Sequence, residues 1–125
     1  MSKYTQDMGE YFAQKRFEKN KELAIDWLVS KVRRVEGRSF NEEDENLFRR
    51  DIADYIDALK EVSMRSAVIC TSETFINKKR GGISLLQIFQ RAGIKRMREE
   101  MISVTINDKD VLVVENRAGK RYSLL

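Results

Sequence analysis

The chain has 125 residues, and 24 Lys and Arg against 20 Asp and Glu give a formal net charge of +4. Hydrophobic residues make up 42% and charged residues 35%, and the apolar periodicity described below predicts a folded protein rather than a disordered one. The absence of histidine excludes Ser-His-Asp and Cys-His catalytic centres and histidine-containing zinc sites. The single cysteine, Cys70, excludes an internal disulfide.

Motifs for membranes, cofactors and catalysis are not found in the sequence. No run approaches the roughly 18 apolar residues that a membrane-spanning helix needs, and the amino terminus has no apolar signal core. Gly81-Gly82 follows a basic run but lacks the spacing of a phosphate-binding loop. We therefore expect a cytoplasmic, non-enzymatic protein with no membrane partner, no cofactor and no metal.

Two amphipathic helices are predicted in the first half of the chain. Residues 1–36 have the three- and four-residue apolar spacing of a helix, with a break at Asn20, which can cap the second part, and a stop at Gly37. A second helix begins at Asn41, where the side chain can cap a first turn of four acids, and continues to Val62. Its acidic residues are expected to form a solvated face rather than a metal site: Asp51, Asp54, Asp57 and Glu61.

Residues 63–77 are ambiguous between helix and strand. The apolar run 67–71 is too short for periodicity to decide, but Met64, Ala67, Val68 and Phe75 can extend the preceding stripe, which favours a helix. Cys70 lies among apolar neighbours and is expected to be an inert core thiol.

Residues 78–98 carry seven positive charges and no acid. Gly81-Gly82 predicts a loop, Ser84 can cap a short helix that stops at Ala92-Gly93, and a second short helix follows with Ile94, Met97 and Met101 on one face. The seven cations are Lys78, Lys79, Arg80, Arg91, Lys95, Arg96 and Arg98.

The remaining residues predict strands. Ile102, Val104 and Ile106 alternate with polar residues, and two further strands, 111–114 and 121–125, follow turns at 107–110 and 116–120. The predicted fold is α+β, with a helical amino-terminal two-thirds followed by a three-stranded antiparallel β-meander. We expect one domain over 1–125, in which 1–77 is a helical scaffold and 78–125 is a basic part containing a helix-turn-helix-like segment and the meander.

The division of charge favours nucleic-acid binding. Residues 1–77 hold 13 Lys and Arg against 15 Asp and Glu, whereas residues 78–125 hold 11 against 5. Clustered cations attract phosphates, and the order helix, Gly93 turn, helix, hairpin resembles a winged helix-turn-helix, from which Phe89 and Glu99 depart. The predicted contacts are the seven cations above together with Arg117, Lys120 and Arg121 at the second hairpin. Whether the partner is DNA or RNA stays open.

The alternative to a regulatory nucleic-acid-binding protein is a protein-interaction module. Apolar residues precede the better-formed helices, and if they are not buried they form an exposed patch that needs a partner: Tyr4, Met8, Tyr11, Phe12 and Phe17. The chain would then bind a larger protein as an inhibitor or adaptor, or form a homo-oligomer through its amino-terminal helices.

Overall fold

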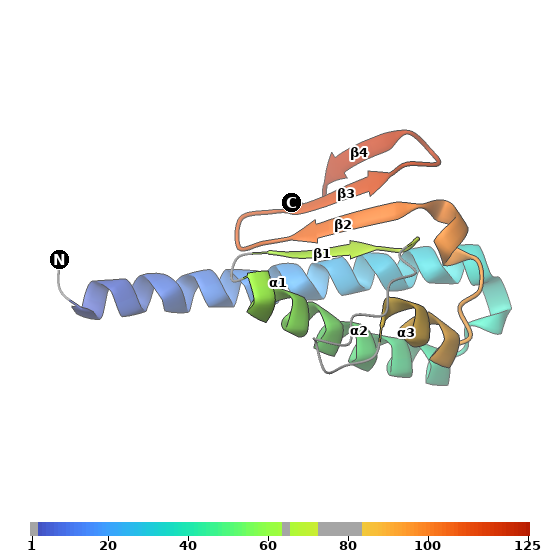
Figure 1. Ribbon diagram of the computed structural model, residues 1–125, viewed down its shortest axis with the longest axis horizontal. Helices are drawn as coiled ribbons and strands as arrows, with labels where there is room; N and C mark the ends of the chain where they lie inside the picture. The colour runs from blue at the N-terminus through green and yellow to red at the C-terminus, as the bar shows by residue number, and fades with distance from the viewer. Residues whose placement is uncertain (1–2, 64–65, 73–83) are drawn as a thin grey trace.

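The computed structural model describes the backbone of residues 3–63, 66–72 and 84–125, with side chains from Met8 onward. Helices come first and most of the sheet comes last, so the fold is α+β, as predicted. Figure 1 shows the sheet above α1, with α2 and α3 below it. The elements are α1 (Lys3–Glu36), the 3-10 helix η1 (Gly37–Ser39), α2 (Glu42–Ser63), β1 (Ala67–Cys70), α3 (Leu85–Arg91), the 3-10 helix η3 (Met97–Glu100), β2 (Ile102–Ile106), β3 (Val111–Glu115) and β4 (Lys120–Ser123).

The described strands form one antiparallel sheet in the order β1-β2-β3-β4. Its last three strands confirm the predicted meander. The first strand, β1, comes from the ambiguous segment, so the preference for a helix there was wrong over 67–70. Ala67 and Ile69 are buried while Val68 is 45% exposed, which is the two-residue alternation of a strand. Pairing with β2 then satisfies the backbone groups of β1 that face β2.

The core lies between the sheet and the helices. Val104 of β2 is opposite Ile69 of β1 and Val113 of β3, and all three side chains are buried. On the helical side, the ring of Phe48 lies 6.2 Å from the rings of both Phe40 and Phe89, measured between centroids. These contacts hold η1, α2 and α3 together beneath α1.

Helix α1 runs without interruption from Lys3 to Glu36, so the predicted break at Asn20 was wrong. Asn20 is buried in the middle of the helix, and its Nδ2 donates a hydrogen bond to the carbonyl oxygen of Asn107, 2.8 Å away in the turn between β2 and β3. The residue therefore makes a tertiary contact instead of capping a helix. In Figure 1 the first turns of α1 extend well beyond the sheet and α2.

The helix caps predicted at Asn41 and Ser84 are confirmed. Asn41 Oδ1 accepts from the backbone amide of Asp44 at 2.9 Å, and Asp44 Oδ2 accepts from the amide of Asn41 at 3.3 Å. Ser84 and Gln87 make the same reciprocal pair at the start of α3, at 3.2 and 2.8 Å. Each capping box satisfies two amides that the helix leaves without a partner.

Candidate nucleic-acid interface

The structure distributes the predicted basic residues unevenly. Lys78, Lys79 and Arg80 lie outside the described residues. Arg91 ends α3, where its Nε lies 3.6 Å from Asp51 Oδ2. The other six lie in or next to η3 and the hairpin of β3 and β4: Lys95, Arg96, Arg98, Arg117, Lys120 and Arg121.

Asp51 corrects the expectation of a solvated acidic face on α2. Its side chain is buried, with Arg91 Nε at 3.6 Å and Arg50 Nε at 3.8 Å from its two oxygens. Asp54 and Glu61 are exposed, as expected, and Asp57 accepts a hydrogen bond from Lys21 Nζ at 3.0 Å. Only part of the acidic set therefore faces solvent.

The predicted recognition helix after Gly93 does not form, so the helix-turn-helix was wrong. Gly93 does turn the chain, with a φ of +69°, but the next element is η3, a single short 3-10 helix. The carboxylate of Glu36 accepts from the backbone amide of Arg96 at 2.9 Å, and Met101, with a φ of +53°, redirects the chain into β2. Too few residues remain between these two points for a helix that could enter a groove.

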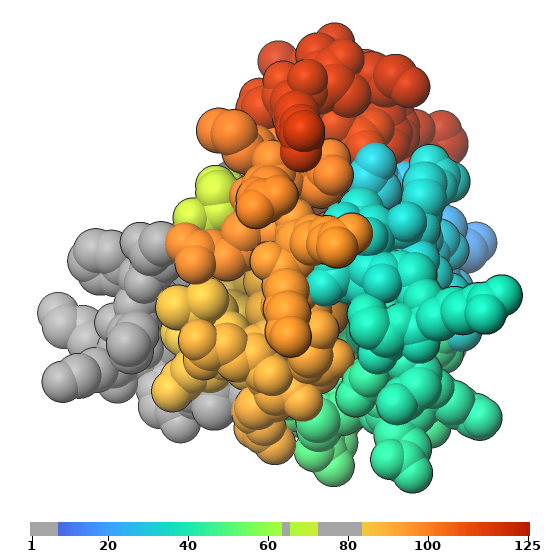
Figure 2. All heavy atoms as spheres, turned by 90° about the vertical axis from the view of Figure 1, so that its right-hand side faces the viewer, coloured from blue at the N-terminus to red at the C-terminus, as the bar shows by residue number. Residues whose placement is uncertain are grey.

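The hairpin of β3 and β4 lies directly against η3. The backbone amide of Asn116 donates to the carbonyl oxygen of Met101 at 3.2 Å, and Arg117 Nη1 lies 3.9 Å from Glu100 Oε1. Figure 2 shows this end of the molecule, with the region around η3 in orange below the hairpin in red. The two groups of cations that the sequence places about twenty residues apart therefore meet on one surface.

The end of α1 adds cations that the functional prediction missed. Arg34 and Arg38 are exposed there, and Arg34 is close enough to Tyr122 of β4 to lower its pKa slightly against stronger opposing effects. Arg34 lies in the last turns of α1, where a cation suits the carbonyl end of a helix, and Arg38 follows in η1. We define the cationic end as Arg34, Arg38, Lys95, Arg96, Arg98, Arg117, Lys120 and Arg121.

Glu115, one of the acids next to this surface, is engaged in hydrogen bonds. Glu115 accepts from Lys31 Nζ and from the Tyr122 hydroxyl, at 2.8 and 2.9 Å. Burial raises the pKa of Glu115, but these two hydrogen bonds and the charges of Lys31 and Lys120 together lower it by more, so the net pKa lies below its ordinary value of 4.5. Burial, together with the hydrogen bond to Glu115, raises the pKa of Tyr122 above 10.0.

Few acids remain to compete for the cationic end. In the described part of the chain, no carboxylate forms an ion pair with the side chain of Arg96 or Arg121, whereas Lys120 lies opposite Glu115 in the hairpin and interacts with its charge. The acidic first turn of α2 borders the surface near Gly93, where Asp44 Oδ2 lies 4.0 Å from the position that a Cβ would take. Anions are therefore favoured on the side of η3 that meets the hairpin.

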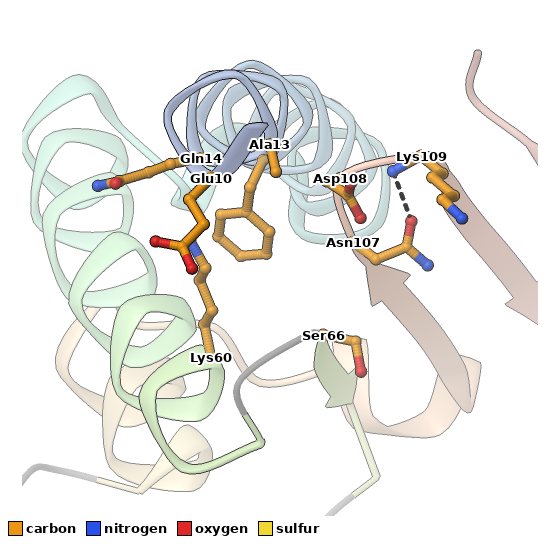
Figure 3. Close-up of a pocket in the computed structure, with 9 residues that line it drawn as sticks. Glu10, Ala13, Gln14, Lys60, Ser66, Asn107, Asp108 and Lys109 are labelled. Atoms are coloured by element: carbon orange, nitrogen blue, oxygen red, sulfur yellow. Dashed lines mark hydrogen bonds between the residues drawn. The ribbon is translucent and has the colours of Figure 1, made fainter. Parts of the chain in front are cut away.

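The opposite end of the molecule has a hollow of about 700 Å³ with charges of both signs. Figure 3 shows Glu10 of α1 and Lys60 of α2 pointing into the same space. Lys60 Nζ lies 4.2 Å above the ring of Phe17, and Asp108 and Lys109 line the other side. With both signs represented, this hollow has no marked preference for anions.

Neither the remaining features of the described residues nor comparisons with known proteins point to a metal site, a membrane span or a family. Among residues 3–63, 66–72 and 84–125, no three Cys, Asp or Glu side chains are grouped to hold a metal ion. Over the same ranges, no helix has the length and apolarity needed to cross a membrane. Comparison with protein-family models, with curated proteins and with solved structures found no match.

Proposed function

We propose that this is a small, non-enzymatic, cytoplasmic protein of regulatory type that binds nucleic acid through the cationic end. The observation that carries the proposal is the hydrogen bond between Asn116 and Met101, which joins the hairpin to η3 and so brings the two predicted basic groups together. Phosphates attract such a surface because binding releases their condensed counterions.

The shape of the surface favours contacts with the phosphate backbone. η3 spans only Met97–Glu100, and β4 only Lys120–Ser123, so neither is long enough to fill a major groove. Arg96, Lys120 and Arg121 are exposed and can reach phosphates on either side of the junction. Contacts of this kind fix position without reading bases, so we expect weak sequence preference.

The test is binding of short labelled duplex DNA, single-stranded DNA and RNA across a salt series. The variant changes three exposed cations of the cationic end to Gln: Arg96, Lys120 and Arg121. The control changes three lysines that are exposed on the other half of the molecule to Gln: Lys15, Lys19 and Lys109. Both variants lose three positive charges.

The two variants are expected to differ. For a duplex, each lost phosphate contact reduces the steepness of the plot of log affinity against log salt by about 0.9. The slope of the variant should therefore be shallower by up to about 2.7, whereas the slope of the control should stay close to that of the unchanged protein. No binding at low salt would contradict the proposal, and so would equal losses in both variants.

A second candidate is the protein-interaction function, favoured by the first turns of α1. Met8, Tyr11 and Phe12 are 40%, 53% and 48% exposed, and the Tyr11 and Phe12 rings contact only one another at 5.6 Å among the described rings. We call these three residues the α1 stripe. Short isolated helices are marginal in water, so a partner on this stripe would stabilise the projecting turns.

A further inference from the structure

A small hollow of about 300 Å³ opens between the end of β1 and η3. Its lining residues are Ser72, Lys95, Arg98 and Glu99, so two cations and a hydroxyl group surround it together with one carboxylate. Lys95 and Arg98 are among the predicted contacts, whereas Ser72 comes from a part of the chain that the functional prediction did not use.

Neighbouring hydrogen bonds hold both walls of the hollow in place. Thr71 is fully buried, its backbone amide donates to the carbonyl oxygen of Ile102, and its hydroxyl accepts from the Ile102 amide, both at 2.9 Å. Ser72 follows directly and is therefore fixed beside the start of β2. On the other wall, Glu36 accepts the amides of Lys95 and Arg96, at 2.5 and 2.9 Å. The carboxylate thus fixes this backbone and leaves the side chains to meet a ligand.

Arg98 gives an independent reason to expect an anion. Its Nε is buried, and among the described residues it has no hydrogen-bond acceptor. A guanidinium keeps its charge at any physiological pH, and buried donors in proteins are nearly always partnered. Because this Nε is closed off from solvent, a rotation of the Arg98 side chain towards the hollow would be needed for an anion there to supply the missing acceptor.

We propose that this hollow is a phosphate-binding subsite in which the side chains of Arg98 and Lys95 hold the phosphate group. The inference deepens the proposed function, because a nucleic acid would be the source of the phosphate, but the same chemistry would also bind free phosphate.

The lining side chains have distinct roles in this subsite. Arg98 offers the planar donor pair that matches two phosphate oxygens, Lys95 adds a compact charge, and the Ser72 hydroxyl can donate to a third oxygen. The carboxylate of Glu99 repels the ligand. Its presence makes the subsite weaker than two cations alone would be.

The experiment is a titration of the full chain with inorganic phosphate, monitored by the NMR signals of the backbone amides and of the Arg98 Nε–H. A titration with sodium chloride at matched ionic strength serves as the reference. We expect the Arg98 Nε–H and the Ser72 amide to shift together and saturably. Lys95→Gln should weaken binding about tenfold or more, the usual loss for a hydrogen bond to a charged group. Glu99→Gln should strengthen it, and Lys109→Gln, in the exposed turn between β2 and β3 outside the cationic end, should leave it unchanged.

The outcomes separate this inference from the proposed function. No saturable shift, or shifts spread equally over the exposed cations, would overturn it. Since Lys95 and Glu99 are exposed, their variants keep the test valid even where a change at the half-buried Arg98 disturbs folding. Phosphate binding without oligonucleotide binding would uphold the subsite and reject the nucleic-acid function. Oligonucleotide binding that leaves the Arg98 Nε–H signal unshifted would uphold the nucleic-acid function and reject the subsite.

Discussion

The carboxylate of Glu36 accepts the backbone amide of Arg96 at 2.9 Å and so joins the end of α1 to the start of η3 across 60 residues of sequence. Its other oxygen accepts the amide of Lys95. One side chain therefore positions the segment that carries three of the eight residues of the cationic end: Lys95, Arg96 and Arg98. It also explains why the chain after Gly93 does not continue as a helix.

Glu36→Ala should destabilise the protein by about 1.5–3 kcal/mol, because hydrogen bonds to a charged group are worth roughly that amount. The measurement is urea denaturation followed by circular dichroism. Glu22→Ala serves as the control, since Glu22 is exposed on the same helix, and it should change the free energy of unfolding by no more than about 0.5 kcal/mol. Equal effects of the two substitutions would show that Glu36 does not hold η3.

Glu115 should make the free energy of unfolding depend on pH in acidic solution. Its folded pKa lies below the ordinary 4.5, since the hydrogen bonds from Lys31 and Tyr122, together with the charges of Lys31 and Lys120, outweigh burial. A lowered folded pKa stabilises the fold above pH 4.5, and this contribution is lost as pH falls from there through the folded pKa. Stability should therefore decline in that window.

Glu115→Gln tests this contribution. It should lower the free energy of unfolding by about 1.5–3 kcal/mol at pH 7, because Lys31 loses its charged partner, and the difference from the unchanged protein should shrink towards pH 3. Urea denaturation at pH 7, 5, 4 and 3 measures it, with exposed Glu10→Gln as the control. A difference that is constant over this range would contradict the assignment.

The alternation in β1 predicts opposite results for two adjacent residues. Ile69 is fully buried opposite Val104, so Ile69→Ala should cost about 2–5 kcal/mol, whereas Val68, which is 45% exposed, should tolerate Ala with a loss below about 1 kcal/mol. Thermal or urea unfolding of both variants measures the difference. Similar losses at both positions would mean that the segment is not a strand with one buried face.

Local signals were enough to predict most of the fold. The capping residues Asn41 and Ser84 start helices because their side chains satisfy nearby amides, and the residues involved are three apart in sequence. The strand Ile102–Ile106 was predictable from strict alternation. Such features depend on neighbours along the chain, so composition and spacing reveal them.

The errors came from partners that are distant in sequence. Asn20 has the chemistry of a helix cap, but its amide is satisfied by Asn107, 87 residues away, so the helix continues through it. The segment Ala67–Cys70 is a strand because β2 pairs with it. The segment after Gly93 is short because Glu36 binds its amides. Periodicity contains no information on any of these contacts.

The candidate site was predictable only as a set of charges. Counting cations identified Lys95, Arg96 and Arg98, but spacing could not show that Ser72 lies beside Lys95 and Arg98, or that Arg34 approaches Tyr122, since folding brings those residues together. The helix-turn-helix was inferred from element order alone, and order does not fix element length.

The α1 stripe provides the last prediction. Changing Tyr11 and Phe12 together to Ser should leave the free energy of unfolding of the monomer nearly unchanged, within about 1 kcal/mol, because both rings are about half exposed. If the stripe binds a second copy, the same change should reduce the mass measured by multi-angle light scattering to that of a monomer. A strictly monomeric unchanged protein would contradict self-association. Loss of folding in the double variant would contradict the exposed placement of the rings, since buried aromatic residues are costly to remove.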